Sequence, residues 1–124
     1  MNMIDIKAGK STPRILLDSV KKQYIIEGQS YPENSSTFYE PVISWIKEHI
    51  SQEKDKFILQ LKLLYINTSS TKAMFYLFDI LEDAFISGID IHINWMYDQE
   101  NEMAKETGEE LLEDLKVPYS IIEV

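Results

Sequence analysis

Two strand-like runs flanking an amphipathic helix most constrain the fold of this chain. Residues 54–66 form the strongest apolar run. Alternate side chains of this run share one face, which we predict to be buried: Phe57, Leu59, Leu61, Leu63 and Tyr65. Residues 69–87 follow with apolar side chains at helical spacing, and Gly88 stands where a helix commonly ends. Residues 89–95 then alternate between apolar and polar side chains. A strand, a helix and a strand in this order predict a right-handed crossover between parallel strands.

The rest of the chain continues the same alternation. The other expected elements are strands at 14–18 and 23–27 joined by a turn at 19–22, a helix at 37–50, a helix at 98–115 and a strand at 118–124. Thr37 and Glu40 have capping-box spacing at the start of the first helix. Residues 1–10 are interpreted as a loose lead-in and residues 28–36 as a loop.

These elements predict a single α/β domain over residues 1–124. Their order is β-β-α-β-α-β-α-β, which favours a mixed, largely parallel sheet with three helices. In a chain of 124 residues the helices can cover mainly one face of the sheet, which gives a two-layer domain.

Composition excludes several classes of function. The chain has no cysteine, which rules out thiolate catalysis and cysteine-based zinc sites. Its net charge of −9 argues against nonspecific nucleic-acid binding. The four glycines are isolated, so no phosphate-binding glycine loop is present, and His49 and His92 are far apart in sequence.

No run is long enough to span a membrane or to act as a signal peptide. We therefore expect a cytoplasmic protein without metal or cofactor.

A polar corner is the clearest chemical feature. The run Asn67-Thr68-Ser69-Ser70-Thr71 ends the apolar strand and opens the next helix. The N-terminus of a helix presents free N–H groups and the positive end of the macrodipole, so a phosphate there would be stabilised. The simpler interpretation is that Asn67, Thr68 or Ser69 is an ordinary N-cap.

Two further surfaces allow two interpretations each. Phe75 and Tyr76 lie one to two turns beyond the corner, and they either form part of a partner-binding patch or pack under a neighbouring loop. Between Asp98 and Asp114 the chain has eight acidic residues and one lysine. This run is either a solvated helix face or a surface that steers a basic partner.

At these residues the chain resembles the SiaC family of regulatory phosphoproteins. The matching segments are Gly28-Gln-Ser-Tyr-Pro-Glu-Asn-Ser35, Leu63-Leu-Tyr-Ile-Asn-Thr-Ser-Ser70 with Lys72-Ala-Met74, Phe78-Asp-Ile-Leu-Glu82, and Trp95-Met-Tyr-Asp98 with Asn101-Glu102. The strand, corner and helix layout also resembles the STAS domains of anti-sigma-factor antagonists, so a STAS-like domain is expected.

The resemblance implies a bacterial, non-enzymatic signalling switch. The phosphorylated threonine of the family corresponds to Thr68, with Ser69, Ser70 and Thr71 as competing hydroxyls. A Ser/Thr kinase would add the phosphate and a PP2C-type phosphatase would remove it. The unmodified form would bind an output partner, a diguanylate cyclase in cyclic-di-GMP signalling and biofilm regulation.

The partner surface is expected to surround Thr68. Its predicted residues are Tyr31, Glu33, Asn34, Asn67, Lys72, Phe75 and Tyr76. An anti-sigma-factor antagonist acting on an anti-sigma kinase is the main alternative. A small hydrolytic enzyme, with Glu33 as base and Thr68 as nucleophile or oxyanion donor, is a weaker one, because nothing supplies an activated nucleophile with an oriented base.

Overall fold

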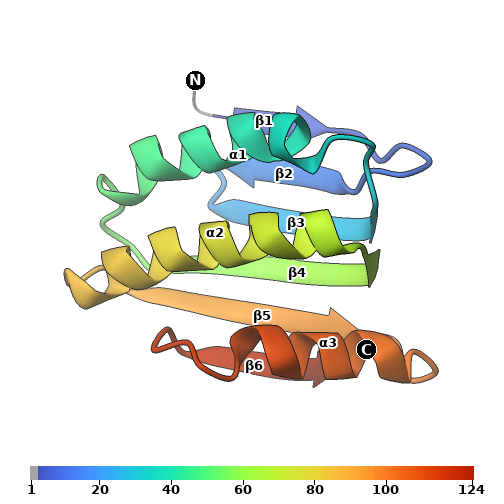
Figure 1. The fold of residues 1–124 in the computed structure, drawn as a ribbon. Helices are drawn as coiled ribbons and strands as arrows, with labels where there is room; N and C mark the ends of the chain where they lie inside the picture. The colour runs from blue at the N-terminus through green and yellow to red at the C-terminus, as the bar shows by residue number, and fades with distance from the viewer. Residues whose placement is uncertain (1–2) are drawn as a thin grey trace.

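The computed structural model describes residues 3–124, which form six strands and three helices (Figure 1). In chain order the elements are β1 (Met3–Ile6), β2 (Arg14–Asp18), β3 (Gln23–Ser30), α1 (Ser35–Ile50), β4 (Phe57–Ile66), α2 (Thr68–Ile86), β5 (Ile91–Tyr97), α3 (Glu102–Leu112) and β6 (Tyr119–Glu123). Among these residues, no helix is both long and apolar enough to cross a bilayer.

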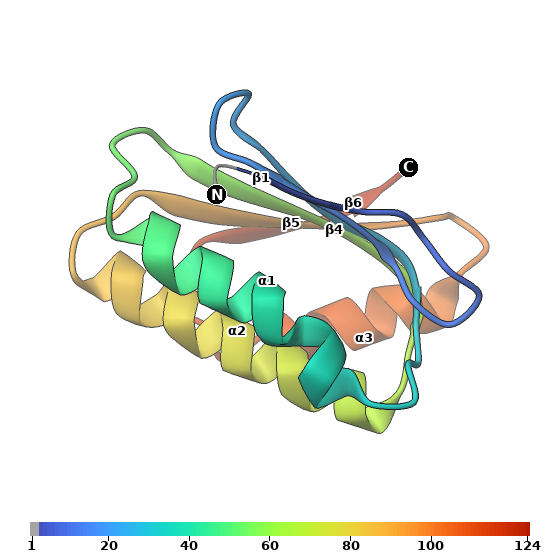
Figure 2. The same ribbon diagram turned by 90° about the horizontal axis from the view of Figure 1, so that it is seen from above.

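The strands lie in the sheet in the same order as in the chain, β1-β2-β3-β4-β5-β6. The first two pairings are antiparallel and the three that follow are parallel. Because successive right-handed crossovers move in one direction, all three helices lie on the same face of the sheet (Figure 2). The predicted two-layer α/β fold with a mixed sheet is confirmed.

The predicted loose lead-in is wrong for residues 3–6, which form β1 at the edge of the sheet. This strand pairs antiparallel with β2 and buries Ile4, while Met3 and Asp5 are exposed. Four residues with one buried side chain give too short an alternation to identify from sequence. Residues 1 and 2 of the predicted lead-in lie outside the described residues.

The predicted loop at 28–36 is also too long, because β3 continues to Ser30. Gly28 has a φ of 117°, and the register with β4 shifts between Gly28 and Gln29. Glycine adopts this backbone conformation without steric cost, so the strand bends and resumes instead of ending. The last residue of β3, Ser30, is consequently buried.

Helix α1 begins earlier than its predicted capping box. Asn34, not Thr37, is the N-cap, and its side chain accepts a hydrogen bond from the Thr37 backbone N–H at 3.1 Å. Pro41 therefore lies inside the helix, where it lacks the N–H for the usual backbone bond. The α2 boundaries are close to those predicted, and Gly88 follows its C-cap with a φ of 112°.

Helix α3 is shorter than predicted and packs closely on β5. Asn101 caps it, so the helix starts at Glu102 instead of Asp98. A Cβ at Gly108 would overlap the indole of Trp95, and this indole donates to the Ala104 carbonyl at 2.9 Å. Glycine is a poor helix former, but only a residue without a Cβ leaves room here for the fully buried Trp95 side chain.

The core lies between the sheet and the helices. Four of the five predicted inward residues of β4 are buried, but Tyr65 is 49% exposed and that part of the prediction is wrong. The buried α2 residues are Ser70, Met74, Leu77, Phe78, Leu81 and Ala84. This packing holds α1 and α2 side by side, with their N-termini at the carboxyl ends of β3 and β4 (Figure 1).

Candidate functional site

The polar corner joins β4 to α2. Asn67 is the N-cap, since its side-chain oxygen accepts the Ser70 backbone N–H at 2.9 Å. Its own backbone N–H donates to the Ser30 carbonyl at 3.0 Å, which fixes the corner against the end of β3. The capping interpretation is therefore correct for Asn67, and Thr68 is the first helical residue.

The four hydroxyls after Asn67 have different environments. Ser70 is fully buried, and its hydroxyl lies 2.9 Å from Ser30 Oγ. Ser69 is exposed but its hydroxyl bonds with Ser35 Oγ at 2.8 Å, and the Thr71 hydroxyl donates to the Asn67 carbonyl at 2.9 Å. Thr68 is exposed, and its hydroxyl makes no hydrogen bond with any residue from 3 to 124. Among these four hydroxyls, that of Thr68 alone is both exposed and free of hydrogen bonds to described residues.

Side chains below the corner form a hydroxyl network that joins the starts of α1 and α2. Its members are Ser30, Ser35, Tyr39, Ser69 and Ser70. Ser30 Oγ shares a 2.5 Å bond with the Tyr39 hydroxyl, and Ser35 Oγ lies 3.2 Å from Ser70 Oγ. Burial raises the pKa of Tyr39 to about 12, so its hydroxyl stays protonated and can donate. The corner is thus held by neutral hydrogen bonds.

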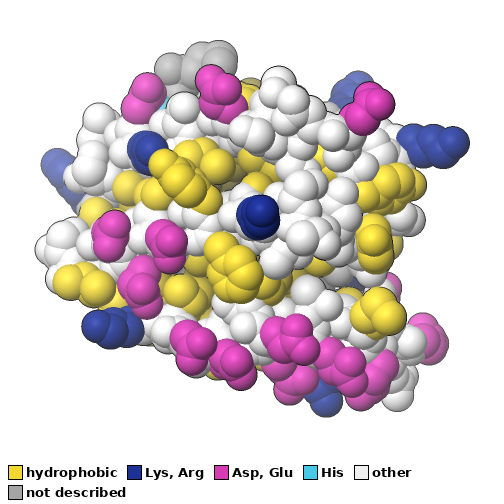
Figure 3. Space-filling view, in the orientation of Figure 1, with side chains coloured by type: hydrophobic (Ala, Val, Ile, Leu, Met, Phe, Trp, Pro, Cys, Tyr) yellow, Lys and Arg dark blue, Asp and Glu magenta, His cyan; other side chains and the backbone are white. Residues whose placement is uncertain are grey.

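The charge around the corner favours an anion. Helix α2 has no acidic residue in its first turn, whereas α3 has Glu102 there. Lys72 lies four residues after Thr68, on the same side of the helix, and is exposed. Figure 3 shows lysine or arginine side chains amid hydrophobic ones over α1 and α2, while acidic side chains gather most densely along α3. The corner is therefore locally less acidic than the chain as a whole.

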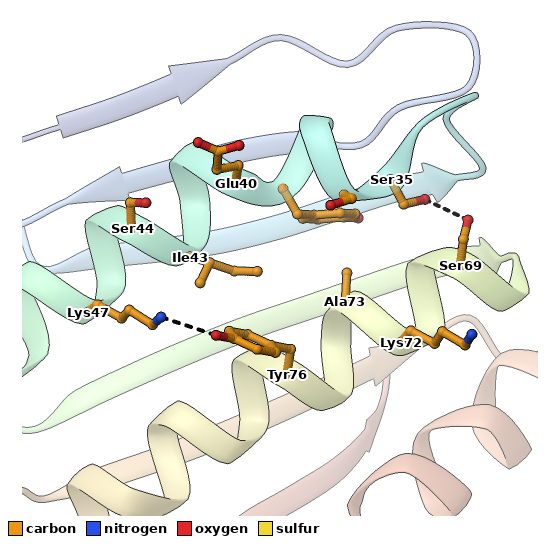
Figure 4. Close-up of a pocket in the computed structure, with 11 residues that line it drawn as sticks. Ser35, Glu40, Ile43, Ser44, Lys47, Ser69, Lys72, Ala73 and Tyr76 are labelled. Atoms are coloured by element: carbon orange, nitrogen blue, oxygen red, sulfur yellow. Dashed lines mark hydrogen bonds between the residues drawn. The ribbon is translucent and has the colours of Figure 1, made fainter.

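A groove of about 480 Å³ runs between α1 and α2. The residues that line it are Ser35, Ser36, Tyr39, Glu40, Ile43, Ser44, Lys47, Ser69, Lys72, Ala73 and Tyr76 (Figure 4). Ser35 and Ser69 bond across one end. Toward the other end, Lys47 Nζ donates to the Tyr76 hydroxyl at 3.2 Å and lies 5.1 Å from the centre of that ring. The groove thus begins beside Thr68 and extends away from it.

The predicted partner-binding residues divide into three groups. Lys72 and Tyr76 line the groove, and Phe75 is exposed on the same helix at 47%, so neither aromatic is packed under a described loop. Tyr31 and Glu33 are exposed outside the groove lining, and the Tyr31 ring meets the Tyr65 ring edge-on at 5.9 Å. Asn34 and Asn67 are helix caps.

Sequence reasoning missed the residues that connect these groups. They are Ser30, Ser35 and Tyr39 of the hydroxyl network, Lys47 and Ile43 of the groove, and the exposed Tyr65. One signal was available, because Asn34-Ser35-Ser36 and Asn67-Thr68-Ser69 both place an Asn cap before small hydroxyl residues. The repeated pattern indicates two helix starts of the same kind, although not that they meet.

The alternative enzyme site places Glu33 and Thr68 at the ends of two different loops. No hydrogen bond joins the carboxylate of Glu33 to Thr68 among the described residues. His49 bonds with the Trp45 carbonyl and His92 with Ser120, which are structural roles. Within residues 3–124 no cluster of His, Asp and Glu could hold a metal ion. Within the described residues, the Thr68 hydroxyl therefore has no hydrogen bond to a carboxylate or a histidine.

Comparisons with known proteins agree on one family. The model of the SiaC family of regulatory phosphoproteins matches residues 6–124. An uncharacterised protein of Pseudomonas aeruginosa strain UCBPP-PA14 is 38% identical over 121 residues, which cover 98% of this chain and 96% of that protein.

Solved structures of SiaC from Pseudomonas aeruginosa have the same fold. The apo-SiaC crystal structure is 37% identical, with a TM-score of 0.91 over 98% of this chain and 99% of that one. A chain in the crystal structure of diguanylate cyclase SiaD in complex with its activator SiaC is also 37% identical, with a TM-score of 0.92 and the same coverage.

Proposed function

The chain belongs to the SiaC family of regulatory phosphoproteins, and we propose that it is a non-enzymatic switch controlled by a phosphate on Thr68. In this proposal a Ser/Thr kinase adds the phosphate and a PP2C-type phosphatase removes it. The unmodified form binds and regulates an output protein, a diguanylate cyclase. SiaC of Pseudomonas aeruginosa, to which this chain is similar, is the activator of such a cyclase, SiaD. Cytoplasmic location is part of the same proposal.

The free, exposed hydroxyl of Thr68 is the observation that carries the proposal. A kinase needs a hydroxyl that its active site can reach, and Ser70 is fully buried while Ser69 and Thr71 are bonded. Modifying Thr68 breaks no hydrogen bond between described residues. Modifying Ser70 would require opening the hydroxyl network.

The position of Thr68 also explains how the fold would tolerate the phosphate. The group adds close to two negative charges and three acceptor oxygens. The first residue of a helix is where the backbone N–H groups and the macrodipole favour an anion, and Lys72 is one turn away. The modified domain therefore stays folded, and the phosphate acts by changing the surface it presents.

The surface changed in this way includes Lys72, one of the predicted partner residues that is exposed. Screening limits the reach of a surface charge to about 8–10 Å. Since each helical residue rises about 1.5 Å, Lys72 lies about 6 Å along the helix from Thr68, within this reach, and Tyr76 lies about 12 Å away, just beyond it. A partner seated on this surface would have to bury a dianion, which is unfavourable unless the partner itself supplies a matching Arg or Lys.

Phosphopeptide mapping tests the site. The protein is expressed with its cognate kinase, and we expect phosphate on Thr68 and none in the Thr68→Ala variant. Ser69→Ala serves as the matched control, because its hydroxyl is exposed but bonded, and it should still be modified. Phosphate found on Ser69, Ser70 or Thr71 instead would refute the assignment.

Pull-down with unmodified and phosphorylated protein tests the output. We expect a diguanylate cyclase to bind the unmodified protein and Thr68→Ala, and to be lost on phosphorylation. Recovery of an anti-sigma kinase instead of a cyclase would favour the antagonist alternative. A cyclase that binds both forms equally would contradict the switch.

A further inference from the structure

Strand β6 leaves one edge of the sheet open. It is the last strand in the sheet, and among the described residues it pairs only with β5 (Figure 1). The Pro118 carbonyl accepts the Ile93 backbone N–H at 3.0 Å, and the Val124 N–H donates to β5 at 2.9 Å. Backbone groups alternate in direction along a strand, so the residues that point away from β5 are Tyr119, Ile121 and Glu123. Their N–H and C=O groups are unpaired within residues 3–124, and we call this row the open edge.

The open edge has little protection against an added strand. Natural edge strands are commonly protected by lysine, proline or a bulge. The five residues of β6 include neither lysine nor proline, and their register with β5 is continuous. The single charged residue of the strand, Glu123, is at its last position, and Tyr119 is 37% exposed. The edge is therefore a template for strand addition by an extended segment.

The charge beside the open edge sets the sign of that segment. Met103 and Thr107 line a pocket with residues of β4, so this flank of α3 faces the middle of the sheet. Lys105 and Glu109 lie about half a turn around the helix, on the flank toward β6. Helix α3 has four glutamates and one lysine, and acidic side chains gather along it in Figure 3. Neither Glu109 nor Glu123 forms an ion pair with a described residue.

From this geometry and charge we propose that the open edge binds an extended basic segment of a second protein, which adds antiparallel to β6. Side chains that pair with the open edge lie on the helix side of the sheet, where Lys or Arg meets the carboxylates of Glu109 and Glu123. The alternate side chains lie on the other face beside Ile122 and are apolar. Because β5 separates β6 from β4, this site is distinct from the polar corner, and its occupancy does not depend on the phosphate on Thr68.

A second copy of the chain is a poorer occupant. Antiparallel pairing of two β6 strands would join two sheets edge to edge, with both sets of helices on the same face. The two α3 helices would then be neighbours, and each has four glutamates against one lysine. Like charges brought together in this way oppose association, whereas a basic segment is attracted by the same carboxylates.

A synthetic peptide tests strand addition. The probe is a heptapeptide of alternating valine and lysine with blocked ends, titrated into the unmodified protein and followed by NMR. Amide hydrogen exchange at Tyr119, Ile121 and Glu123 should slow at least tenfold when the peptide binds. Backbone N-methylation of its lysines, which removes the N–H groups facing β6, should abolish this protection. N-methylation of its valines is the matched control and should preserve it, and equal protection by both methylated peptides would overturn backbone pairing.

Charge reversal tests the recognition of the basic side chains. Glu109→Lys should weaken peptide binding at least tenfold with an unchanged melting temperature. Glu110→Lys is the matched control, because it makes the same change on the other flank of α3, and it should bind within twofold of the wild type. Equal binding of a valine and glutamate peptide would overturn the basic segment. Protection of the open edge that rises with protein concentration, without any peptide, would assign the edge to a second copy and also overturn it.

Discussion

The two ends of the sheet are stabilised by different chemistry. At the carboxyl ends of β3 and β4, the hydroxyl network joins α1 to α2 through neutral groups. At the opposite end, the Glu53 carboxylate has a side chain only 5% exposed and accepts bonds from Lys22 Nζ at 2.8 Å and the Tyr24 hydroxyl at 3.0 Å. It also accepts the backbone N–H groups of Lys54 and Asp55.

This difference indicates where the domain can respond to a new charge. Burial of Glu53 favours its neutral form, but the bonds from Lys22, Asp55 and Tyr24 outweigh that effect and lower its pKa. A charge at this end is already matched by donors. The hydroxyl network at the corner has no charged member, so a charge added inside it is uncompensated, whereas a charge at the exposed Thr68 is tolerated.

The largest effect should come from placing a charge in the neutral network. Ser70→Asp buries a carboxylate among hydroxyls, and we expect a loss of about 3 kcal/mol or more in the free energy of unfolding. Ser70→Ala, which removes the hydroxyl without adding charge, should lose about 1–3 kcal/mol. Urea denaturation measures both. The control Ser36→Asp, exposed in the first turn of α1, should be nearly neutral, and equal stability of Ser70→Asp and Ser36→Asp would remove the contrast between the ends.

Removing the charge at the opposite end should have an intermediate effect. Glu53→Gln should lower the unfolding free energy by about 1–3 kcal/mol at pH 7, because it weakens charge-assisted bonds. Since the folded pKa of Glu53 lies below its ordinary value of 4.5, its contribution is complete above that value and is lost as the pH falls through the folded pKa.

The difference between wild type and Glu53→Gln should therefore shrink below pH 4.5. Urea titrations at pH 7 and at progressively lower pH follow this change. Glu113→Gln, at an exposed position, should show no such difference. If the difference in unfolding free energy between wild type and Glu53→Gln stays constant down to the lowest pH, the donors do not hold Glu53 in its ionised form.

The smallest effects separate the cap from the switch residue. Asn67→Ala should cost about 1 kcal/mol, because it removes the N-cap bond to Ser70. Thr68→Ala should cost less than about 0.5 kcal/mol, since its hydroxyl bonds to no described residue. Thermal unfolding of the two variants compares them directly, and a larger loss for Thr68→Ala would give the hydroxyl a structural role.

The sequence predicted those parts of the molecule that depend on local pattern. The β4–α2–β5 unit, the hairpin of β2 and β3, and the end of α2 before Gly88 follow from periodicity and turn chemistry. The polar corner follows from the same patterns, which leave Thr68, Ser69, Ser70 and Thr71 as equal candidates, and only the family resemblance selects Thr68. What separates Thr68 from Ser70 is burial against Ser30, a residue 40 positions away, and a single sequence carries no signal for that contact.

The wrong predictions also concern features that depend on contacts between residues distant in the sequence. Residues 3–6 form a strand because β2 offers them an edge, and residues 28–30 stay in the sheet because Gly28 permits a bulge. Thr37 has a capping-box pattern but Asn34 caps the helix, since the end of β3 places the turn there. The groove between α1 and α2 likewise exists only once two distant helices lie side by side.

The agreement between strand order in space and in the chain bears on how the protein assembles during synthesis. Each strand pairs with the one made just before it, so every new segment leaving the ribosome meets an edge that already exists. The contacts that close the corner all lie between residues 30 and 71, whereas α3 spans Glu102–Leu112. A nascent chain is therefore expected to acquire its polar corner before its acidic helix has emerged.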